Sequence, residues 1–219
     1  MFDLILLMAG KGSRVGLDYN KIKYEINGIA LYKYALNEFL KSKNLNKVIL
    51  VVSSDDFEEF KNLKEFQNDR YVICVGGKER QDSVRSGLVY VTSDYVLVHD
   101  GARANIRIEE IEKVYEACTK YDVAALGVFE QNAIKKVKDN FLVETLDRAD
   151  VVCMQTPQGA KVSLLKAALD KINTIVYDDV EAIKKVFNKD AYLVLGRYDN
   201  IKVTNKSDLE LIKVLLKKE

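Results

Sequence analysis

The sequence predicts an α/β fold with a mostly parallel, Rossmann-like sheet and helices on both of its faces. Short runs rich in valine, isoleucine and leucine are typical of strands buried in a parallel sheet, and they occur at residues 2–8, 47–52, 71–75, 95–98 and 123–128. Between them, residues 29–41 and 108–120 carry apolar side chains three and four positions apart, as amphipathic helices do. Because helices alternate with strands, we expect parallel strands and ligands bound beyond their carboxyl ends.

The pattern changes after residue 128. Two alternating runs flank Lys138, Asp139 and Asn140, which indicates a β-hairpin. An isolated hairpin is only marginally stable in water, so we expect residues 130–152 to form a β-arm that packs on a second subunit. Helices are then expected at 162–171, at 179–187 and from Ser207, with a strand at 192–195. Because no linker, repeat or low-complexity tract interrupts the chain, we predict one domain over residues 1–219 with this arm.

Charge and composition exclude several classes of partner. The 34 Lys and Arg residues nearly cancel the 33 Asp and Glu residues, so no global field favours a nucleic acid or an anionic membrane. The apolar stretch at residues 4–9 is too short for a signal peptide or a membrane span. We therefore expect a cytoplasmic protein with no nucleic-acid or membrane partner.

The cysteines and the histidine argue against metal clusters. Cys74, Cys118 and Cys153 are widely spaced and odd in number, and His99 is the only histidine. A zinc site or a disulfide framework is therefore not expected, and a mechanism that needs two histidines is excluded. Each cysteine has apolar neighbours, so we expect all three to be small core residues.

The first candidate site is the loop Met-Ala-Gly-Lys-Gly-Ser-Arg, which follows the first predicted strand and ends at Arg14. Gly10 and Gly12 allow backbone N–H groups to approach phosphate oxygens, and Arg14 and Lys21 add positive charge. The loop lacks the third glycine and the downstream acid of a dinucleotide site, and it has no Walker A lysine. An ordinary strand-to-helix turn is the alternative; we favour a site for a triphosphate.

A second glycine-rich segment, Gly-Gly-Lys-Glu-Arg-Gln-Asp-Ser-Val, begins at Gly76. Ser83 and residues 84–91 predict a helix start, and polar groups at such a start suit the edge of a nucleobase or ribose. A Gly-Gly turn before a capped helix accounts equally well for Gly76, Gly77 and Ser83. It does not account for Arg80 and Asp82 together, so both interpretations stay open on the residues alone.

The third candidate is the acid at the end of the strand predicted at residues 95–98. Asp100 follows His99 at the carboxyl end of this strand, and Mg²⁺ prefers one or two carboxylates together with substrate phosphates. We therefore predict Asp100 as a functional residue. We expect His99 to be structural, with its ring hydrogen-bonded beside the strand end.

Further polar residues lie in the arm and beyond it: Lys135, Arg148, Gln155 to Gln158, Asp178, Asp179 and Asn200 to Thr204. Pro157 is the only proline of the chain, so it predicts a defined turn at residues 155–158. Lys202 interrupts an apolar, strand-like stretch. If it is buried it needs an acidic or phosphate partner; a solvated edge strand is the alternative.

Taken in order, these motifs resemble the 2-C-methyl-D-erythritol 4-phosphate cytidylyltransferase family. Its members read Ala-Gly-x-Gly-x-Arg, then a Lys, Gly-Gly-x-x-Arg-x-x-Ser-Val, His-Asp-x-x-Arg-Pro, Asp-Thr-x-Lys, Gln-Thr-Pro-Gln and Asn-x-Lys-x-Thr. The resemblance covers residues 4–211, and six motifs in the same order are more specific than any one of them. It implies a nucleotidyltransferase sheet, a homodimer, Mg²⁺ as the divalent cofactor, and transfer of CMP from CTP to a sugar-alcohol phosphate.

The resemblance also implies roles for matching positions. Arg14 and Lys21 would stabilise the pentacoordinate α-phosphorus by electrostatic preorganisation, with no covalent intermediate. Arg148 would reach the sugar phosphate across a dimer interface, and Asp100 would bind Mg²⁺. The implied nucleotide-binding residues are Ala9, Gly10, Gly12, Gly76, Gly77, Asp82, Ser83 and Lys202, and the implied substrate-binding residues are Arg103, Lys135 and Thr156.

Three positions depart from the family pattern. Asn20 and Ala104 replace prolines, which changes only backbone rigidity. Ala133 replaces the threonine of Asp-Thr-x-Lys and removes a hydroxyl that normally faces the substrate. Ribitol 5-phosphate, the substrate of a sister family, therefore stays an alternative acceptor, although Gly101 and Ser83 lie in motifs closer to the methylerythritol type.

We predict transfer of CMP to 2-C-methyl-D-erythritol 4-phosphate. The alternative of another class is a non-catalytic nucleotide-binding protein, and uridylyl or adenylyl transfer is a further possibility. Charged residues are retained at every position where the resemblance implies catalysis or phosphate contact, which argues against the non-catalytic alternative: Arg14, Lys21, Asp100, Arg148 and Lys202.

Overall fold

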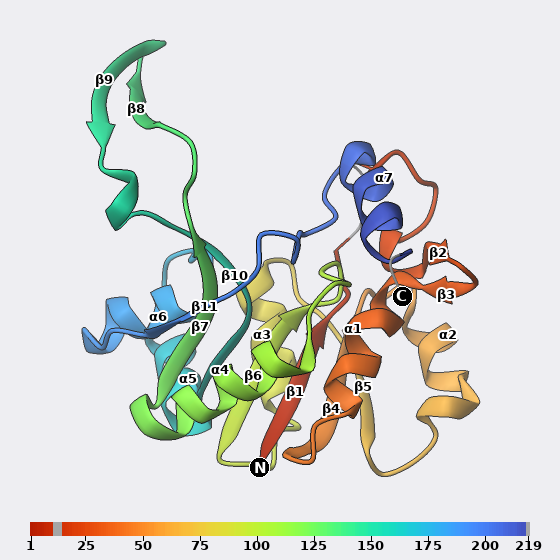
Figure 1. Cartoon of the computed structure of the whole chain (residues 1–219). Helices are drawn as coiled ribbons and strands as arrows, with labels where there is room; N and C mark the ends of the chain where they lie inside the picture. The colour runs from red at the N-terminus through yellow and green to blue at the C-terminus, as the bar shows by residue number, and fades with distance from the viewer. Residues whose placement is uncertain (11–14, 218–219) are drawn as a thin grey trace.

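The computed structural model describes residues 1–10 and 15–217, which fold around one large sheet (Figure 1). The sheet has seven strands in this described part, in the spatial order β11 (Tyr192–Leu195), β7 (Val123–Phe129), β10 (Val152–Lys161), β6 (Tyr95–Asp100), β1 (Phe2–Leu7), β4 (Leu45–Val52) and β5 (Tyr71–Val75). Strand β10 runs antiparallel to β6 and β7, and the other neighbouring pairs are parallel. The predicted α/β fold with a mostly parallel sheet is confirmed.

The central strands are buried on both faces, as their continuous apolar sequences predict. Along β1, Phe2, Leu4 and Leu6 belong to one core cluster and Ile5 to the other. Successive side chains of a strand point to opposite faces of the sheet. An unbroken apolar run is therefore what a strand needs when helices cover both faces.

Helices form a layer on each side of the sheet (Figure 1). One core cluster contains side chains of α1 (Leu31–Leu40), α2 (Phe57–Asn62) and α4 (Ile108–Tyr121). The other contains side chains of α3 (Arg80–Leu88), α5 (Val162–Lys171) and α6 (Asp179–Phe187). Helices α1, α4, α5 and α6 confirm the periodic patterns in the sequence. The sequence did not predict α2, since its single short segment repeats the apolar spacing too few times.

Helix α3 begins at Arg80, earlier than the start predicted at Ser83, and it ends at Leu88. The reason is a capping box: the Glu79 side chain accepts from the backbone of Asp82, and the Glu79 N–H donates to Asp82 Oδ2 at 3.1 Å. These two bonds satisfy donors that a helix start otherwise leaves open. Glutamate is not a usual N-cap residue, so the sequence pattern did not reveal this start.

The predicted turn at residues 155–158 is wrong, because this segment lies inside strand β10. The Thr156–Pro157 peptide is cis, and the pairing of β10 with β7 is irregular between Met154 and Gln158. Proline has no N–H to donate to a ladder, so an interruption of the pairing occurs there while the strand continues on either side. The strand passes between β6 and β7 and is antiparallel to both, a position that the sequence patterns did not predict.

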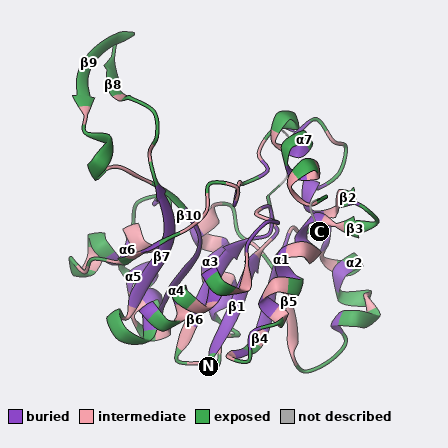
Figure 2. Cartoon of the chain, viewed as in Figure 1, coloured by how far each residue is buried: buried purple, intermediate pink, exposed green. Residues whose placement is uncertain are grey.

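The predicted hairpin is present and projects from the body of the molecule as an arm (Figure 1). It consists of β8 (Ile134–Lys138) and β9 (Phe141–Leu146), and Asp139 and Asn140 between them have φ values of 49° and 67°. Positive φ at both central residues is the requirement of a type I′ two-residue hairpin turn. The arm is exposed along both strands (Figure 2).

A third, smaller core cluster lies near the end of the sheet where β1 and β6 terminate. It combines residues of α7 (Lys206–Leu215) with Val15, Val203 and Ile26, which lies on β2 (Glu25–Ile26) of a short hairpin whose second strand is β3 (Ile29–Ala30). Helix α7 begins one residue before the predicted Ser207. Residues 201–204, in contrast, form neither a buried nor an edge strand. Val203 packs in this cluster instead, and its N–H donates to Ala102 O at 2.9 Å.

Cys74 and Cys118 are buried, but Cys153 is exposed, so the expectation of three core cysteines is wrong for Cys153. The first residues of β10 lie toward the arm and outside the helical layers, which leaves Cys153 uncovered. A search of the described residues finds no helix long and apolar enough to cross a membrane.

Candidate active site

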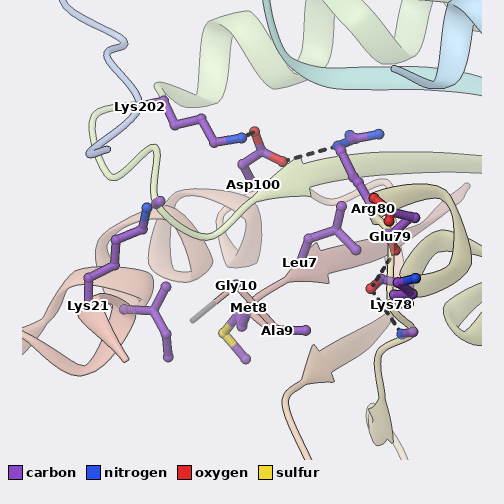
Figure 3. Close-up of a pocket in the computed structure, with 14 residues that line it drawn as sticks. Leu7, Met8, Ala9, Gly10, Lys21, Lys78, Glu79, Arg80, Asp100 and Lys202 are labelled. Carbon is purple, nitrogen blue, oxygen red and sulfur yellow. Dashed lines mark hydrogen bonds and ion pairs between the residues drawn. The ribbon is translucent and has the colours of Figure 1, made fainter. Parts of the chain in front are cut away.

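The carboxyl ends of β1 and β6 border a cleft. The chain runs from β1 outward through β4 to β5, and β6 then begins the other half of the sheet on the opposite side of β1. Ligands of open α/β sheets bind at this kind of switch point. The cleft has a volume of about 220 Å³, which can hold part of a nucleotide, and it is lined by Leu7, Met8, Ala9, Gly10, Lys21, Ile22, Gly77, Lys78, Glu79, Arg80, Ser83, Asp100, Ala102 and Lys202 (Figure 3).

Asp100 is the buried carboxylate of this cleft, with an exposure of 7%. Lys202 Nζ lies 2.8 Å from its Oδ2, and Arg80 Nε lies 3.5 Å from its Oδ1. Burial alone would raise the pKa of Asp100, but the positive charges of Arg80 and Lys202 outweigh burial and hold this pKa well below its usual range. Asp100 is therefore ionised at neutral pH, as an anionic ligand for a cation requires.

The backbone of Asp100 is fixed by a buried chain of hydrogen bonds. Its N–H donates to Thr156 Oγ1 at 3.1 Å, and the Thr156 hydroxyl lies 3.0 Å from His99 Nδ1, to which it donates because the other ring nitrogen faces a carbonyl that can only accept. The remaining ring nitrogen, His99 Nε2, then carries the proton and donates to Arg103 O at 3.1 Å. Burial lowers the pKa of His99 to about 4, which agrees with this neutral tautomer. His99 is structural, as expected.

The loop after β1 contributes the floor of the cleft. Met8, Ala9 and Gly10 line it, and Met8 N–H donates to Val51 O at 2.7 Å, which keeps the chain on the sheet up to this point. Gly12 and Arg14, predicted as phosphate and transition-state contacts, lie outside the described residues.

The segment from Gly76 to Ser83 forms a second wall. A Cβ at Gly76 would lie 2.7 Å from both Ala9 Cβ and Ser83 Oγ, closer than real side chains approach. Glycine at this position therefore allows the two loops to pack together. Ser83 Oγ accepts from Gly77 N–H at 3.1 Å. Asp82 is engaged in the helix cap and in an ion pair with Arg85 at 2.7 Å, so its predicted contact with cytidine stays a prediction.

Two lysines reach the cleft from segments far apart in the sequence. Lys21, at the start of the 3₁₀ turn Lys21–Lys23, is 8% exposed and lines the cleft. Lys202 comes from the loop before α7 and is paired with Asp100. Figure 3 shows both lysines on one side of Asp100 and Arg80 on the other. Lys202 therefore has the acidic partner that was expected if it were buried, although the Lys202 side chain is 41% exposed.

The other predicted substrate residues occupy different surroundings. Arg103 donates to Asn200 O at 2.8 Å and to Met154 O at 3.3 Å, so it ties the loop after β6 to two other segments. Thr156 is 4% exposed and its hydroxyl serves the Asp100 backbone. Lys135 and Arg148 are exposed on the arm and at its base, where Arg148 donates to Gln131 O at 2.9 Å. Within one chain the structure does not bring these two arm residues to the cleft.

One charged contact at the edge of the site, between Arg80 and Asp179, was not predicted from the sequence. Arg80 lies between two buried acids: besides its contact with Asp100, its Nη2 lies 2.9 Å from Asp179 Oδ2 at the start of α6. The Asp179 N–H donates to Gln158 Oε1 at 2.9 Å. The arginine of the Gly-Gly-x-x-Arg motif was a sufficient signal for Arg80, but nothing in the sequence around Asp179 linked it to this motif.

The donor set fits a hard divalent cation that is held mainly by its substrate. Among the described residues, no group of three or more His, Cys, Asp and Glu side chains is close enough to hold a metal ion alone. Asp100 offers one ionised carboxylate in the cleft. Mg²⁺ often binds through one or two carboxylates and substrate phosphates, so Asp100 is the residue that could hold it here.

Known proteins are similar to this chain over its whole length. A family model described as 2-C-methyl-D-erythritol 4-phosphate cytidylyltransferase (IspD) matches residues 2–218. The 2-C-methyl-D-erythritol 4-phosphate cytidylyltransferases of Clostridium perfringens and Bacillus mycoides are 37% and 36% identical, over 97% and 95% of both chains. The crystal structure of 4-diphosphocytidyl-2C-methyl-D-erythritol synthase from Anaerococcus prevotii matches with a TM-score of 0.87 at 26% identity, over 100% of this chain and 96% of that one. The chain therefore belongs to the 2-C-methyl-D-erythritol 4-phosphate cytidylyltransferase family.

Proposed function

We infer that this protein transfers CMP from CTP to 2-C-methyl-D-erythritol 4-phosphate. The products are 4-diphosphocytidyl-2-C-methyl-D-erythritol and pyrophosphate. The observation that carries this conclusion is the match of residues 2–218 to the family. Its structural support is the cleft at the switch point, where Lys21, Arg80 and Lys202 surround a single ionised aspartate.

The reaction needs charge stabilisation rather than a strong base. The phosphate of the acceptor is already an anion, so one of its oxygens can form the new bond to the α-phosphorus of CTP while the bond to pyrophosphate breaks. No proton has to be removed for this step. Cations fixed around the α-phosphorus stabilise the charge that develops in the transition state. We propose Lys21 in this role from the cleft, together with Arg14.

We propose that the second wall holds the cytidine. Ala9, Gly76, Gly77 and Ser83 lie where two glycine-containing loops pack closely. Backbone groups exposed by the glycines can hydrogen-bond the edge of a base, and the tight packing of the loops favours a pyrimidine over a larger purine. Lys202 would contact the phosphates, which requires its ammonium to be shared between Asp100 and the nucleotide.

We propose Mg²⁺ as the cofactor, with Asp100 as its protein ligand. When bound, Mg²⁺ supplies positive charge to the triphosphate and lowers the cost of bringing a second anion to it. Asp100 is suited to hold it, because its carboxylate is ionised and its backbone is fixed by Thr156. The cations beside Asp100 would exchange part of their contact with its carboxylate for contacts with the phosphates.

The acceptor end is proposed to be completed by a second copy of the chain. Lys135 and Arg148 belong to the arm at residues 130–152 and do not line the cleft of their own chain. In a homodimer joined through the arms, Arg148 of one subunit would bind the acceptor phosphate at the cleft of the other. Arg103 and Thr156 would then support this site from the strand ends. A single domain with this arm, active in the cytoplasm, is the organisation that we propose.

Pyrophosphate release from CTP tests the function directly. With Mg²⁺ present, we expect rapid release with 2-C-methyl-D-erythritol 4-phosphate and little with ribitol 5-phosphate; the reverse preference would overturn the proposed acceptor. No release with either would support the non-catalytic alternative. Addition of EDTA should stop turnover and excess Mg²⁺ should restore it. Substituting UTP, ATP or GTP for CTP tests the other nucleotidyl transfers.

A further inference from the structure

Asn20 holds the segment that carries Lys21, although it is not part of the reaction described above. Asn20 is 8% exposed and caps the 3₁₀ turn Lys21–Lys23. Its Oδ1 accepts from Ile22 N–H at 3.3 Å, and its carbonyl accepts from Lys23 N–H at 3.0 Å. The direction in which the chain enters Lys21 is therefore determined by this one residue.

The amide group of Asn20 also joins this turn to two other parts of the site. Its Nδ2 donates to Met8 O at 2.8 Å and to Asp56 Oδ2 at 3.0 Å. Met8 lies at the end of β1 and lines the same cleft as Lys21. Through Asn20, the start of the phosphate loop and the Lys21 turn are therefore held in a fixed relation.

Asp56 is the anchor of this arrangement. It is 6% exposed, and it accepts from Ser53 Oγ at 2.7 Å and from Lys23 Nζ at 2.7 Å as well as from Asn20. Burial alone would raise the pKa of Asp56, but the hydrogen bonds from Lys23 and Asn20 outweigh burial and keep this pKa below its usual value. The ionised carboxylate thus receives three side-chain donors in a buried place, which makes a rigid junction.

Lys21 and Lys23, the two lysines of the turn, lie in different surroundings. Lys23 is bound by Asp56 and also by Glu59 at 2.9 Å, whereas Lys21 lines the cleft. The backbone of Asn20 has φ −65° and ψ 122°. This φ is the value that a proline ring imposes covalently; here hydrogen bonds of the Asn20 side chain impose it instead.

We propose that Asn20 and Asp56 are positioning residues for Lys21 in cytidylyl transfer. They contact neither nucleotide nor acceptor; they fix the backbone from which the Lys21 ammonium reaches the α-phosphorus. This inference rests on the proposed function. It implies that loss of the junction weakens transition-state stabilisation more than nucleotide binding, because the CTP contacts come largely from other segments.

Steady-state kinetics of a small set of variants tests the inference. For Asn20→Ala we expect kcat to fall by about tenfold or more with KM for CTP nearly unchanged, since a displacement of about 1 Å can cost up to ~100-fold in rate. Asn20→Pro should recover part of kcat, because the ring restores φ and Lys23 still joins the turn to Asp56. Asp56→Ala, which keeps the Asn20 cap, should lose kcat in the same selective way. Asp55→Ala changes an exposed neighbour of the same residue type and should match the wild type.

The outcomes separate the inference from the function on which it rests. A kcat of Asn20→Ala within about twofold of the wild type would overturn the inference, and so would equal losses in Asn20→Ala and Asn20→Pro. If Asn20→Ala does not fold, the Asp56→Ala variant decides by the same split between kcat and KM. A wild-type protein that releases no pyrophosphate would overturn the proposed function, and the inference with it.

Discussion

The cleft at the carboxyl ends of β1 and β6 and the arm at residues 130–152 differ in how far their groups find partners within one chain. In the cleft, Asp100 is 7% exposed and has two cationic partners within 3.5 Å. On the arm, Phe141 and Leu142 are 75% and 70% exposed. The carboxylate of the cleft thus has charged partners within its own chain, whereas the apolar side chains of the arm are exposed to solvent.

The difference indicates which region would depend on the second subunit that we propose. Burying a large apolar side chain contributes about 1.5–3 kcal/mol, and the arm carries four exposed ones at Val137, Phe141, Leu142 and Val143. A two-stranded hairpin is marginal by itself. We therefore expect changes in the cleft to affect chemistry within each subunit, and changes on the arm to affect assembly first.

The largest effect is expected for Lys21→Ala in the cleft. Turnover should fall by at least ~100-fold, about 3 kcal/mol of transition-state stabilisation. CTP binding should remain, because Gly77, Ser83 and the other walls of the cleft are unchanged. Single-turnover kinetics and a direct binding titration measure the two quantities. Lys33→Ala is the matched control, because it removes a lysine of α1 that is paired with Glu65. Nearly unchanged turnover in Lys21→Ala would refute the role given to it.

An intermediate effect is expected for Phe141→Lys on the arm. A charge in place of a large apolar side chain should shift the dimer toward monomer by about tenfold or more in dissociation constant, since loss of ~1.4 kcal/mol is enough for this. Sedimentation equilibrium measures the shift, and activity should fall with it. Lys136→Ala on the same hairpin is the control. If Phe141→Lys stays dimeric with full activity, the arm is not the interface, and the contrast with the cleft does not hold.

The smallest effect on activity is expected for Asp3→Asn. Asp3 is a buried carboxylate that lies outside the cleft and holds backbone groups together. Asp3 Oδ2 accepts from Thr92 N–H at 2.5 Å and from Ser93 N–H at 3.0 Å. Its replacement should lower the free energy of unfolding at neutral pH by about 1–3 kcal/mol, with kcat unchanged. Urea unfolding and steady-state assays check both. A loss of kcat without loss of stability would contradict the structural role.

The pH dependence of the same variant has a definite sign. Burial alone would raise the pKa of Asp3, but hydrogen bonds from the backbone of Thr92 and Ser93 outweigh burial and lower this pKa below the model-peptide value of 3.8. A lowered folded-state pKa means that the stabilisation is complete above pH 3.8 and is lost as the pH falls through the folded-state pKa. The difference in stability between wild type and Asp3→Asn should therefore shrink in acid and persist at neutral pH.

The sequence determined the parts of this protein that depend on local patterns. Continuous apolar runs predicted β1 and its neighbours because a strand covered on both faces must be apolar at every position. The segment Lys138-Asp-Asn predicted the arm because Asp and Asn readily adopt the positive φ values that a tight hairpin turn requires. Asp100 stood out because an acid at the end of an apolar strand lies at the ligand-binding edge of such a sheet. The roles assigned to the site residues remain predictions that the variants above can test.

Only the tertiary structure decided which distant segments meet. No local pattern indicated that β10 lies antiparallel between β6 and β7, because strand order depends on long-range pairing and is masked here by the single proline. The same holds for the contacts of Lys202 with Asp100, of Arg80 with Asp179 and of Asn20 with Asp56. Each joins charged or polar groups from different elements, and their partners are set by the packing of the sheet and of the small cluster around α7. Residue type fixed what these groups can do, and the fold fixed what they act upon.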